Sequence, residues 1–230
     1  MILNKYIIEA RLFPTLICIF PLFIFQYFFL NEKISGFLNY LGSMEFIGNT
    51  TFSLVLLYLM MQINRTIGKT FFEKRYYQNG LYMPTTNFLM ISNNEYSKDY
   101  KINFHRKIKT DFNIELLDEL DEKNNEIKAR KKIAEAISLI RCKIGSGRLL
   151  LQHNTEYGFT RNLIGGSIPA VFFSLINIYF ALNVHDNFVL IISIIACVFF
   201  LIIVVFSKTI LTQKGKSYAK ILFQEYSAMK

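Results

Sequence analysis

Residues 188–206 are the most strongly apolar stretch of this 230-residue chain. Their sequence, FVLIISIIACVFFLIIVVF, contains no charge at nineteen consecutive positions. An α-helix rises 1.5 Å per residue, so this stretch is about as long as the ~30 Å hydrocarbon core of a bilayer is thick. Less uniform apolar stretches of similar length occupy residues 12–30, 46–63 and 163–183. The sequence therefore predicts a mainly α integral membrane protein with four transmembrane helices.

The charges between these stretches predict how the chain crosses the membrane. Of a formal net charge of +9, most lies in residues 64–162, with 18 Lys/Arg against 12 Asp/Glu, and in the C-terminal tail. Because basic residues near membrane helices stay on the cytoplasmic side, we expect both termini and the central segment inside, and a loop at residues 31–45 outside. The expected parts are two N-terminal helices, an inserted and mostly helical cytoplasmic domain, a helical hairpin and a basic tail, at residues 1–63, 64–162, 163–206 and 207–230.

The central segment carries patterns typical of amphipathic helices. Residues 81–91 are expected to be extended or loop-like, after which Ser92 and Glu95 match a capping box that would open a helix. An acidic stretch, residues 115–126, is expected to be a solvated segment between helices. Isoleucines spaced by four, three and four residues then predict a second amphipathic helix, at Ile133, Ile137, Ile140 and Ile144.

Basic residues on and after this second helix form the candidate binding site. Lysine and arginine side chains close together in sequence can hold the phosphates of a nucleotide or of a short single strand. A solvated face of an ordinary helix would show the same charges. The candidate ligand-binding residues are Lys128, Lys131, Lys132, Arg141, Lys143, Arg148, His153 and Arg161.

Arg148 and His153 also match the R-x4-H spacing of HEPN ribonucleases, in which the two residues act together on an RNA phosphate. That family usually places a polar residue directly after the arginine, whereas Leu149 stands here, and the segment also fits a short strand. The chain has no phosphate-binding loop, nucleophile elbow or metal-ligand cluster. We therefore expect no catalytic residue, no metal and no cofactor, and the three cysteines predict neither a disulfide framework nor a zinc site.

Small and polar residues recur along one face of the third apolar stretch, and paired glycines, Gly165 and Gly166, precede them. The glycines would serve either as a hinge or as a place of close helix approach. The stripe has two interpretations, close helix packing with shared hydrogen bonds or the lining of a pore in a symmetric oligomer. No Asp, Glu, Lys, Arg or His lies within the four stretches, which argues against an ion-coupled transporter. The candidate pore-lining residues, spaced three, four, three and four apart, are Ser167, Ala170, Ser174, Asn177 and Ala181.

The layout of the apolar stretches, the basic residues 128–148 and the segment HNTEYGFTRNLIGGS (residues 153–167) together resemble small membrane effectors of bacterial anti-phage defence systems. The resemblance is to the Hailong-type membrane effector and, more distantly, to accessory membrane proteins of type VI CRISPR loci. It implies a homo-oligomer of roughly four or more subunits in the bacterial cytoplasmic membrane. The oligomer would form a pore gated by an anionic nucleotide or short oligonucleotide from a cognate signal-producing protein, or would disrupt the membrane. In either form it would depolarise an infected cell. The alternatives are a membrane-anchored scaffold that recruits a partner protein and a HEPN-like ribonuclease.

Overall fold

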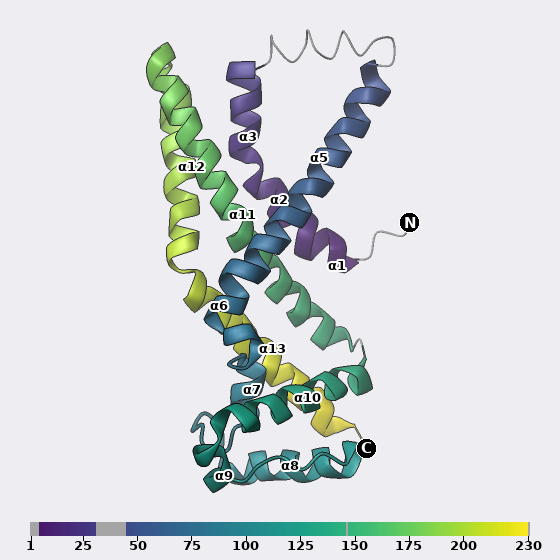
Figure 1. The fold of residues 1–230 in the computed structure, drawn as a ribbon. Helices are drawn as coiled ribbons and strands as arrows, with labels where there is room; N and C mark the ends of the chain where they lie inside the picture. Colours follow the sequence, from purple (N-terminus) through teal and green to yellow (C-terminus); the bar gives the residue numbers. More distant parts are fainter. Residues whose placement is uncertain (1–4, 31–44, 146, 230) are drawn as a thin grey trace. The chain divides into compact units, whose positions relative to one another are not determined.

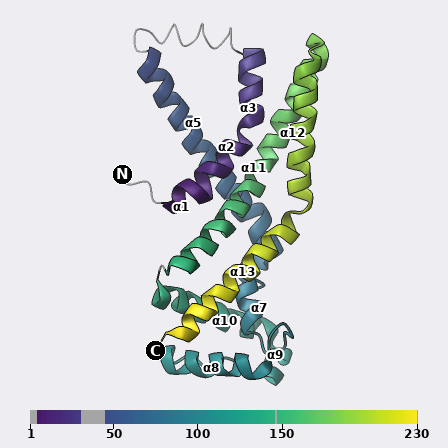
Figure 2. The same ribbon diagram turned by 180° about the vertical axis from the view of Figure 1, so that it is seen from behind.

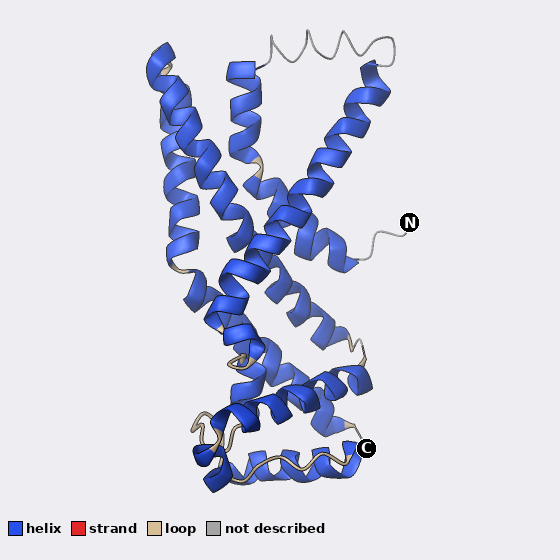
Figure 3. Ribbon diagram, viewed as in Figure 1, coloured by secondary structure: helices blue, strands red, loops and turns tan. Residues whose placement is uncertain are grey.

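The computed structural model describes residues 5–30, 45–145 and 147–229. Of the described residues, 87% are helical and none lies in a strand (Figure 3). Contacts between residues divide the chain into two compact units. The first, called here the apolar unit, comprises Met1–Phe72 and Gly158–Lys208; the second, called the charged unit, comprises Glu73–Tyr157 and Thr209–Lys230.

Three helices within the described residues are long and apolar enough to cross a membrane, namely Lys5–Phe29, Leu149–Val184 and Asn187–Val205. They overlap three of the four stretches that the sequence marks as transmembrane. The fourth stretch, residues 46–63, lies within helix α5 (Glu45–Ile67), and its crossing of a membrane stays a prediction. The loop expected at residues 31–45 lies, except for its last residue, outside the described residues.

The N-terminal helix of the apolar unit, residues 5–30, is interrupted by irregular turns. Pro14 and Pro21 stand in the first turns of two of its segments, where an absent N–H breaks no intrahelical hydrogen bond of that segment. Two of the other segments are π-helical, a geometry that is rare and occurs frequently at functional sites. In chain order the segments are α1 (Lys5–Ile7), η1 (Ile8–Leu12), α2 (Phe13–Cys18), α3 (Phe20–Phe25) and η2 (Gln26–Leu30).

Two of the apolar helices, α11 and α12, form an antiparallel pair (Figure 1), as expected for the predicted helical hairpin. Helix α11 (Arg148–Val184) is continuous over 37 residues and contains Pro169. After a turn at His185, helix α12 (Asn187–Val205) begins, and the Asp186 carboxylate caps it by accepting hydrogen bonds from the backbone N–H groups of Phe188 and Val189. The capping carboxylate satisfies donors that a helix start otherwise leaves unpaired.

Helix α5 continues without a break in the chain into η3 (Gly68–Glu73) and α6 (Lys74–Tyr76), as the apolar stripe beyond Ile63 suggests. Figure 2 shows the same ribbon from behind, including the elements that come after α6. The helices of the charged unit after α6 are η4 (Gln78–Gly80), α7 (Pro84–Leu89), α8 (Lys98–Phe112), α9 (Glu119–Asn124), α10 (Glu126–Ile144) and α13 (Ser207–Ala228), the last of which begins in the apolar unit.

The core of the charged unit is built from α7, α8, α10 and α13. Helix α10 buries Ile133, Ile137 and Ile140, which confirms the predicted isoleucine face. The C-terminal helix supplies Phe223 and Tyr226 to the same cluster, both fully buried. The basic C-terminal tail therefore packs against the other helices of the charged unit.

Three local expectations were wrong. Residues 84–89 are neither extended nor loop-like but form α7, because Pro84 occupies the favourable first position of this helix, whose apolar face is buried. The next helix begins at Lys98 rather than after Ser92. The backbone N–H of Ser92 is bonded instead to a carboxylate oxygen of Glu122, so the capping-box hydrogen bonds do not form. The segment from Arg148 to His153 is the helical start of α11, not a strand.

Candidate functional site

The polar stripe of α11 is the most distinctive feature of the apolar unit. Its five residues are fully or almost fully buried within one chain, with exposed fractions of 0% for Ser167, Ala170, Ser174 and Asn177 and 1% for Ala181. This burial matches the packing interpretation of the stripe. That these residues line a pore stays a prediction, and it requires a conformation in which part of the apolar unit has moved away from them.

The N-terminal helix is bonded to α11 through backbone carbonyls. Asn162 Nδ2 donates to the carbonyl oxygen of Ala10 at 2.6 Å, and Asn177 Nδ2 donates to that of Pro21 at 2.8 Å. Pro14 has no N–H for the carbonyl four residues earlier, which is that of Ala10. Asn162 therefore supplies a donor to this carbonyl, as expected when a neighbouring helix compensates a proline in a membrane.

Several polar atoms in this packing have no hydrogen-bond partner among the described residues. They are Asn162 Oδ1, Asn177 Oδ1 and Ser193 Oγ, and all are buried. The hydroxyl groups of Ser167 and Ser174 donate to carbonyls of the preceding turn of α11. A buried polar atom without a partner costs free energy. The packing around the stripe is therefore less favourable than an all-apolar interface would be.

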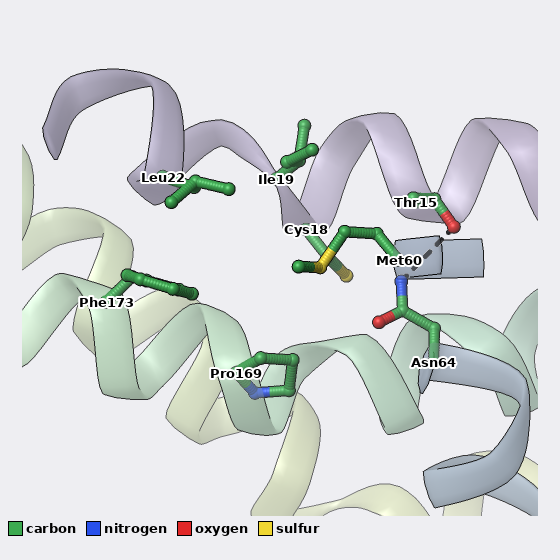
Figure 4. Close-up of a pocket in the computed structure, with 8 residues that line it drawn as sticks. All are labelled: Thr15, Cys18, Ile19, Leu22, Met60, Asn64, Pro169 and Phe173. Carbon is green, nitrogen blue, oxygen red and sulfur yellow. Dashed lines mark hydrogen bonds between the residues drawn. The ribbon is translucent and has the colours of Figure 1, made fainter. Parts of the chain in front are cut away.

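A small cavity lies where the N-terminal helix, α5 and α11 meet (Figure 4). Its volume is about 10 Å³, close to the minimum for a single water molecule. Asn64 Nδ2 donates to Thr15 Oγ1 at 3.2 Å beside it, and the Thr15 hydroxyl donates to the carbonyl oxygen of Arg11. The cavity is lined by Thr15, Cys18, Ile19, Leu22, Met60, Asn64, Pro169 and Phe173.

Glycines bring the backbones of α11 and of the α5–η3 segment into direct contact. A methyl group on Gly165 would lie 2.5 Å from the nitrogen of Gly68 and closer still to the carbonyl oxygen of Asn64. One on Gly166 would lie 2.6 Å from the Asn64 side chain. The glycines thus permit the close approach of two helices. Helix α11 passes through both without interruption, and their service as a hinge stays a prediction.

The candidate ligand-binding residues do not form one cluster. Of those on α10, Lys132 Nζ donates to the carbonyl oxygen of Glu115 at 3.0 Å, and the Arg141 guanidinium lies 5.4 Å from the centre of the Tyr218 ring. Lys128 and Lys131 are exposed. A helix rises 1.5 Å per residue, so Lys128 and Lys143 lie about 22 Å apart along α10.

The remaining candidate ligand-binding residues lie at the end of α10 or on α11. Lys143 pairs with Asp111 at 2.8 Å, and this hydrogen bond holds the pKa of Asp111 below its usual value. His153 is half-buried on α11, and Arg161 belongs to the apolar unit. Arg148 begins α11, and its side chain lies outside the part that the structure describes. The described geometry brings together no set of these residues around a common point.

Sequence reasoning missed a group of charged residues buried in the charged unit. Lys101 is fully buried and donates from Nζ to the carbonyl oxygens of Met90, at 2.7 Å, and Asn93. Burial lowers the pKa of Lys101. Glu122, within the stretch expected to be solvated, is 1% exposed and accepts hydrogen bonds from the backbone N–H groups of Ile91 and Ser92 at 3.0 Å. These residues hold the turn after α7, and no local pattern predicts their burial.

Side chains of α13 and of the segment after α5 hold the first turns of α11 within the charged unit. Glu225 Oε1 accepts a hydrogen bond from the backbone N–H of Leu150 at 3.1 Å and so caps the start of α11. Two turns later, Glu156 pairs with Lys214 at 2.8 Å, and Tyr157 donates to a carboxylate oxygen of Glu73 at 3.2 Å. The start of α11 is therefore fixed to the charged unit at several points.

Comparison with protein-family models, with curated proteins and with solved structures gives no match. The class of the protein therefore rests on its own helices. Three of the described helices have the length and composition of membrane-crossing segments, which indicates a helical membrane protein. Groups of acidic, histidine or cysteine side chains that could hold a metal ion are absent from the described residues.

Proposed function

We propose that the protein is an oligomeric membrane effector that forms an ion-conducting pore and acts in anti-phage defence by depolarising the membrane of the cell. The observation that carries the proposal is the composition and continuity of α11. One uninterrupted helix of 37 residues carries the polar stripe and also begins with turns that are fixed within the charged unit. A change in the charged unit would reach the stripe through this one continuous helix.

The polar stripe supports conduction by an assembly of several copies. Its serine and asparagine side chains offer oxygen atoms that could replace part of the hydration of an ion. One chain with so few membrane helices is too small to enclose a pore, so the proposal requires a symmetric oligomer. Unpaired buried atoms such as Asn177 Oδ1 would gain water as partners when the stripe becomes wet.

The proposed signal is an anionic nucleotide or short oligonucleotide bound by the charged unit. Lys128 and Lys131 support it, because both are exposed on neighbouring turns of α10. We propose the bacterial cytoplasmic membrane, with both termini inside, as the location, from the distribution of basic residues. The resemblance to anti-phage membrane effectors supplies the biological role and a cognate signal-producing protein.

A membrane-anchored scaffold is the second candidate. The stripe is completely buried within one chain, so the fold needs no further assembly to cover it. Under this alternative, the charged unit would recruit a partner protein, and no ligand would cause a current.

Ionic current across planar bilayers that contain the purified protein separates the two candidates. The pore proposal predicts a current that changes when nucleotides or short oligonucleotides are added. Replacing Asn177 by leucine should alter the single-channel conductance, whereas Leu175→Ala, on the exposed side of the same helix, should not. Bilayers that stay silent with every ligand would contradict the pore and favour the scaffold.

A further inference from the structure

The polar stripe is covered on one side by the N-terminal helix, residues 5–30. The side chain of Asn177 reaches the carbonyl of Pro21 on that helix. One turn beyond, Ala181 packs with Ile24 in one buried cluster, and Ala170 packs with Cys18 in another. The N-terminal helix therefore covers the stripe from Ala170 to Ala181.

Helix α12 covers another side of the stripe, but its connection to α11 differs. The turn at His185 and Asp186 joins α11 and α12 directly, and the Asp186 cap secures the first residues of α12. A hairpin with so short a connection moves as a pair. The N-terminal helix is not joined to α11 in this way, and its polar attachments in this unit include the hydrogen bonds from Asn162 and Asn177.

The N-terminal helix is also built irregularly. It contains two π-helical segments, η1 and η2, and Pro14 and Pro21 divide the part between them. Helices with such interruptions bend at defined points. In contrast, α12 is a regular helix over 19 residues. Of the two elements that cover the stripe, the N-terminal helix is thus the one whose geometry suits a change of position.

We infer that the N-terminal helix is the gate of the proposed pore, held closed by the hydrogen bonds from Asn162 and Asn177. Its movement away from α11 uncovers the stripe, and the two asparagines exchange backbone carbonyls for water. This inference rests on the proposed function, because a gate has meaning only if the stripe conducts. It assigns the closed state to the structure described here.

A disulfide between the N-terminal helix and α11 tests the gate. A methyl group on Gly158 would lie 3.1 Å from Cβ of Ala10, slightly less than the ~3.5–4.5 Å between the Cβ atoms of a disulfide. The nearest other atom is the hydroxyl of Tyr6, the end of a side chain that can turn aside. The variant Ala10→Cys/Gly158→Cys should form the bond when Cys142, which is exposed, is replaced by serine.

We expect the oxidised variant to give no signal-dependent current in planar bilayers and to recover the current after a reductant is added. The single variant Ala10→Cys, treated identically, is the control and should respond to signal under both conditions. In the opposite direction, Asn162→Leu removes one interhelical hydrogen bond and should raise the open probability without signal by about threefold to twentyfold. Leu175→Ala, which touches no part of the gate, should leave it unchanged.

The possible results separate the gate from the pore. A current that persists in the oxidised variant, with the disulfide verified by mass spectrometry, would overturn the gate and leave the pore intact. Failure of the two cysteines to pair would also overturn the gate, because their proximity is part of the closed packing. Silence of the wild type and of Asn162→Leu under every condition would overturn the proposed function and the gate with it.

Discussion

Alanine at Gly165 is predicted to destabilise the apolar unit, although alanine is the better helix former. A methyl group there would lie 2.9 Å from the Cα atom of Gly68, which is roughly 0.6–1.1 Å inside the ordinary 3.5–4.0 Å separation of carbon atoms. The opposing atoms are backbone and cannot rotate away. Overpacking of this kind costs about 1–3 kcal/mol, whereas the change from glycine to alanine within a helix gains about 1 kcal/mol. Because the opposing atoms are backbone, the cost falls in the upper part of that range, about 2–3 kcal/mol, and the expected net loss is about 1–2 kcal/mol.

Thermal unfolding in detergent, followed with a thiol-reactive fluorescent dye, would measure this loss. Cys18 and Cys197 are buried in the apolar unit and become reactive when it opens, and a Cys142→Ser background removes the exposed thiol. The expected decrease in Tm is about 2–8 °C for a chain of this length. Leu175→Ala, at an exposed position of the same helix, should change Tm little. A Gly165→Ala protein as stable as the wild type or more so would refute the close helix contact.

Three further predictions concern buried polar groups. Asn162→Leu should destabilise the protein by about 1 kcal/mol in detergent unfolding. In the double variant, Pro14→Ala should reduce this cost, because it restores a backbone N–H for the carbonyl of Ala10. If the costs of the two substitutions simply add, the proposed compensation is wrong. Glu122→Ala should accelerate amide hydrogen exchange in the turn after α7 and cost about 2–3 kcal/mol, whereas Glu135→Ala on the exposed face of α10 should do neither. The hydrogen bond from Lys143 holds the pKa of Asp111 below its usual 3.8. The ionised Asp111 side chain therefore contributes its full stability above pH 3.8, and this stability is lost as the pH falls through the lowered pKa. Asp111→Asn should therefore flatten the loss of stability below about pH 4, and an unchanged acid transition would count against the ion pair.

The elements that could be predicted from sequence are those with a long or repeated apolar pattern. The stretch 188–206 and the isoleucine face of α10 each carry enough apolar residues at helical spacing to outweigh local alternatives. The Ser92–Glu95 capping box failed because its residues had competing partners elsewhere in the chain. The Ser92 N–H is bonded to Glu122, thirty residues away, and no local rule contains that information.

The candidate site, too, was predictable from sequence only in part. The helical spacing of Ser167, Ala170, Ser174, Asn177 and Ala181 places them on one face, and the structure has them on one buried face of α11. Sequence did not indicate that this face would be covered by the N-terminal helix. The basic residues of α10 were close together in sequence, but some of their long side chains bind partners of their own, as Lys143 does with Asp111 and Lys132 with the carbonyl oxygen of Glu115, whereas Lys128 and Lys131 are exposed. Closeness in sequence along a helix does not place flexible side chains at one point.

By itself, the sequence determined the class of the protein and the faces of its principal helices. Both follow from the hydrophobic effect, which depends on composition and periodicity and can be evaluated over one segment at a time. Only the tertiary structure decided which polar groups meet. Asn162 finds the carbonyl that Pro14 leaves free, and Gly165 meets the backbone at Gly68, because hydrogen bonds and steric contacts act over a few ångströms between segments distant in the chain.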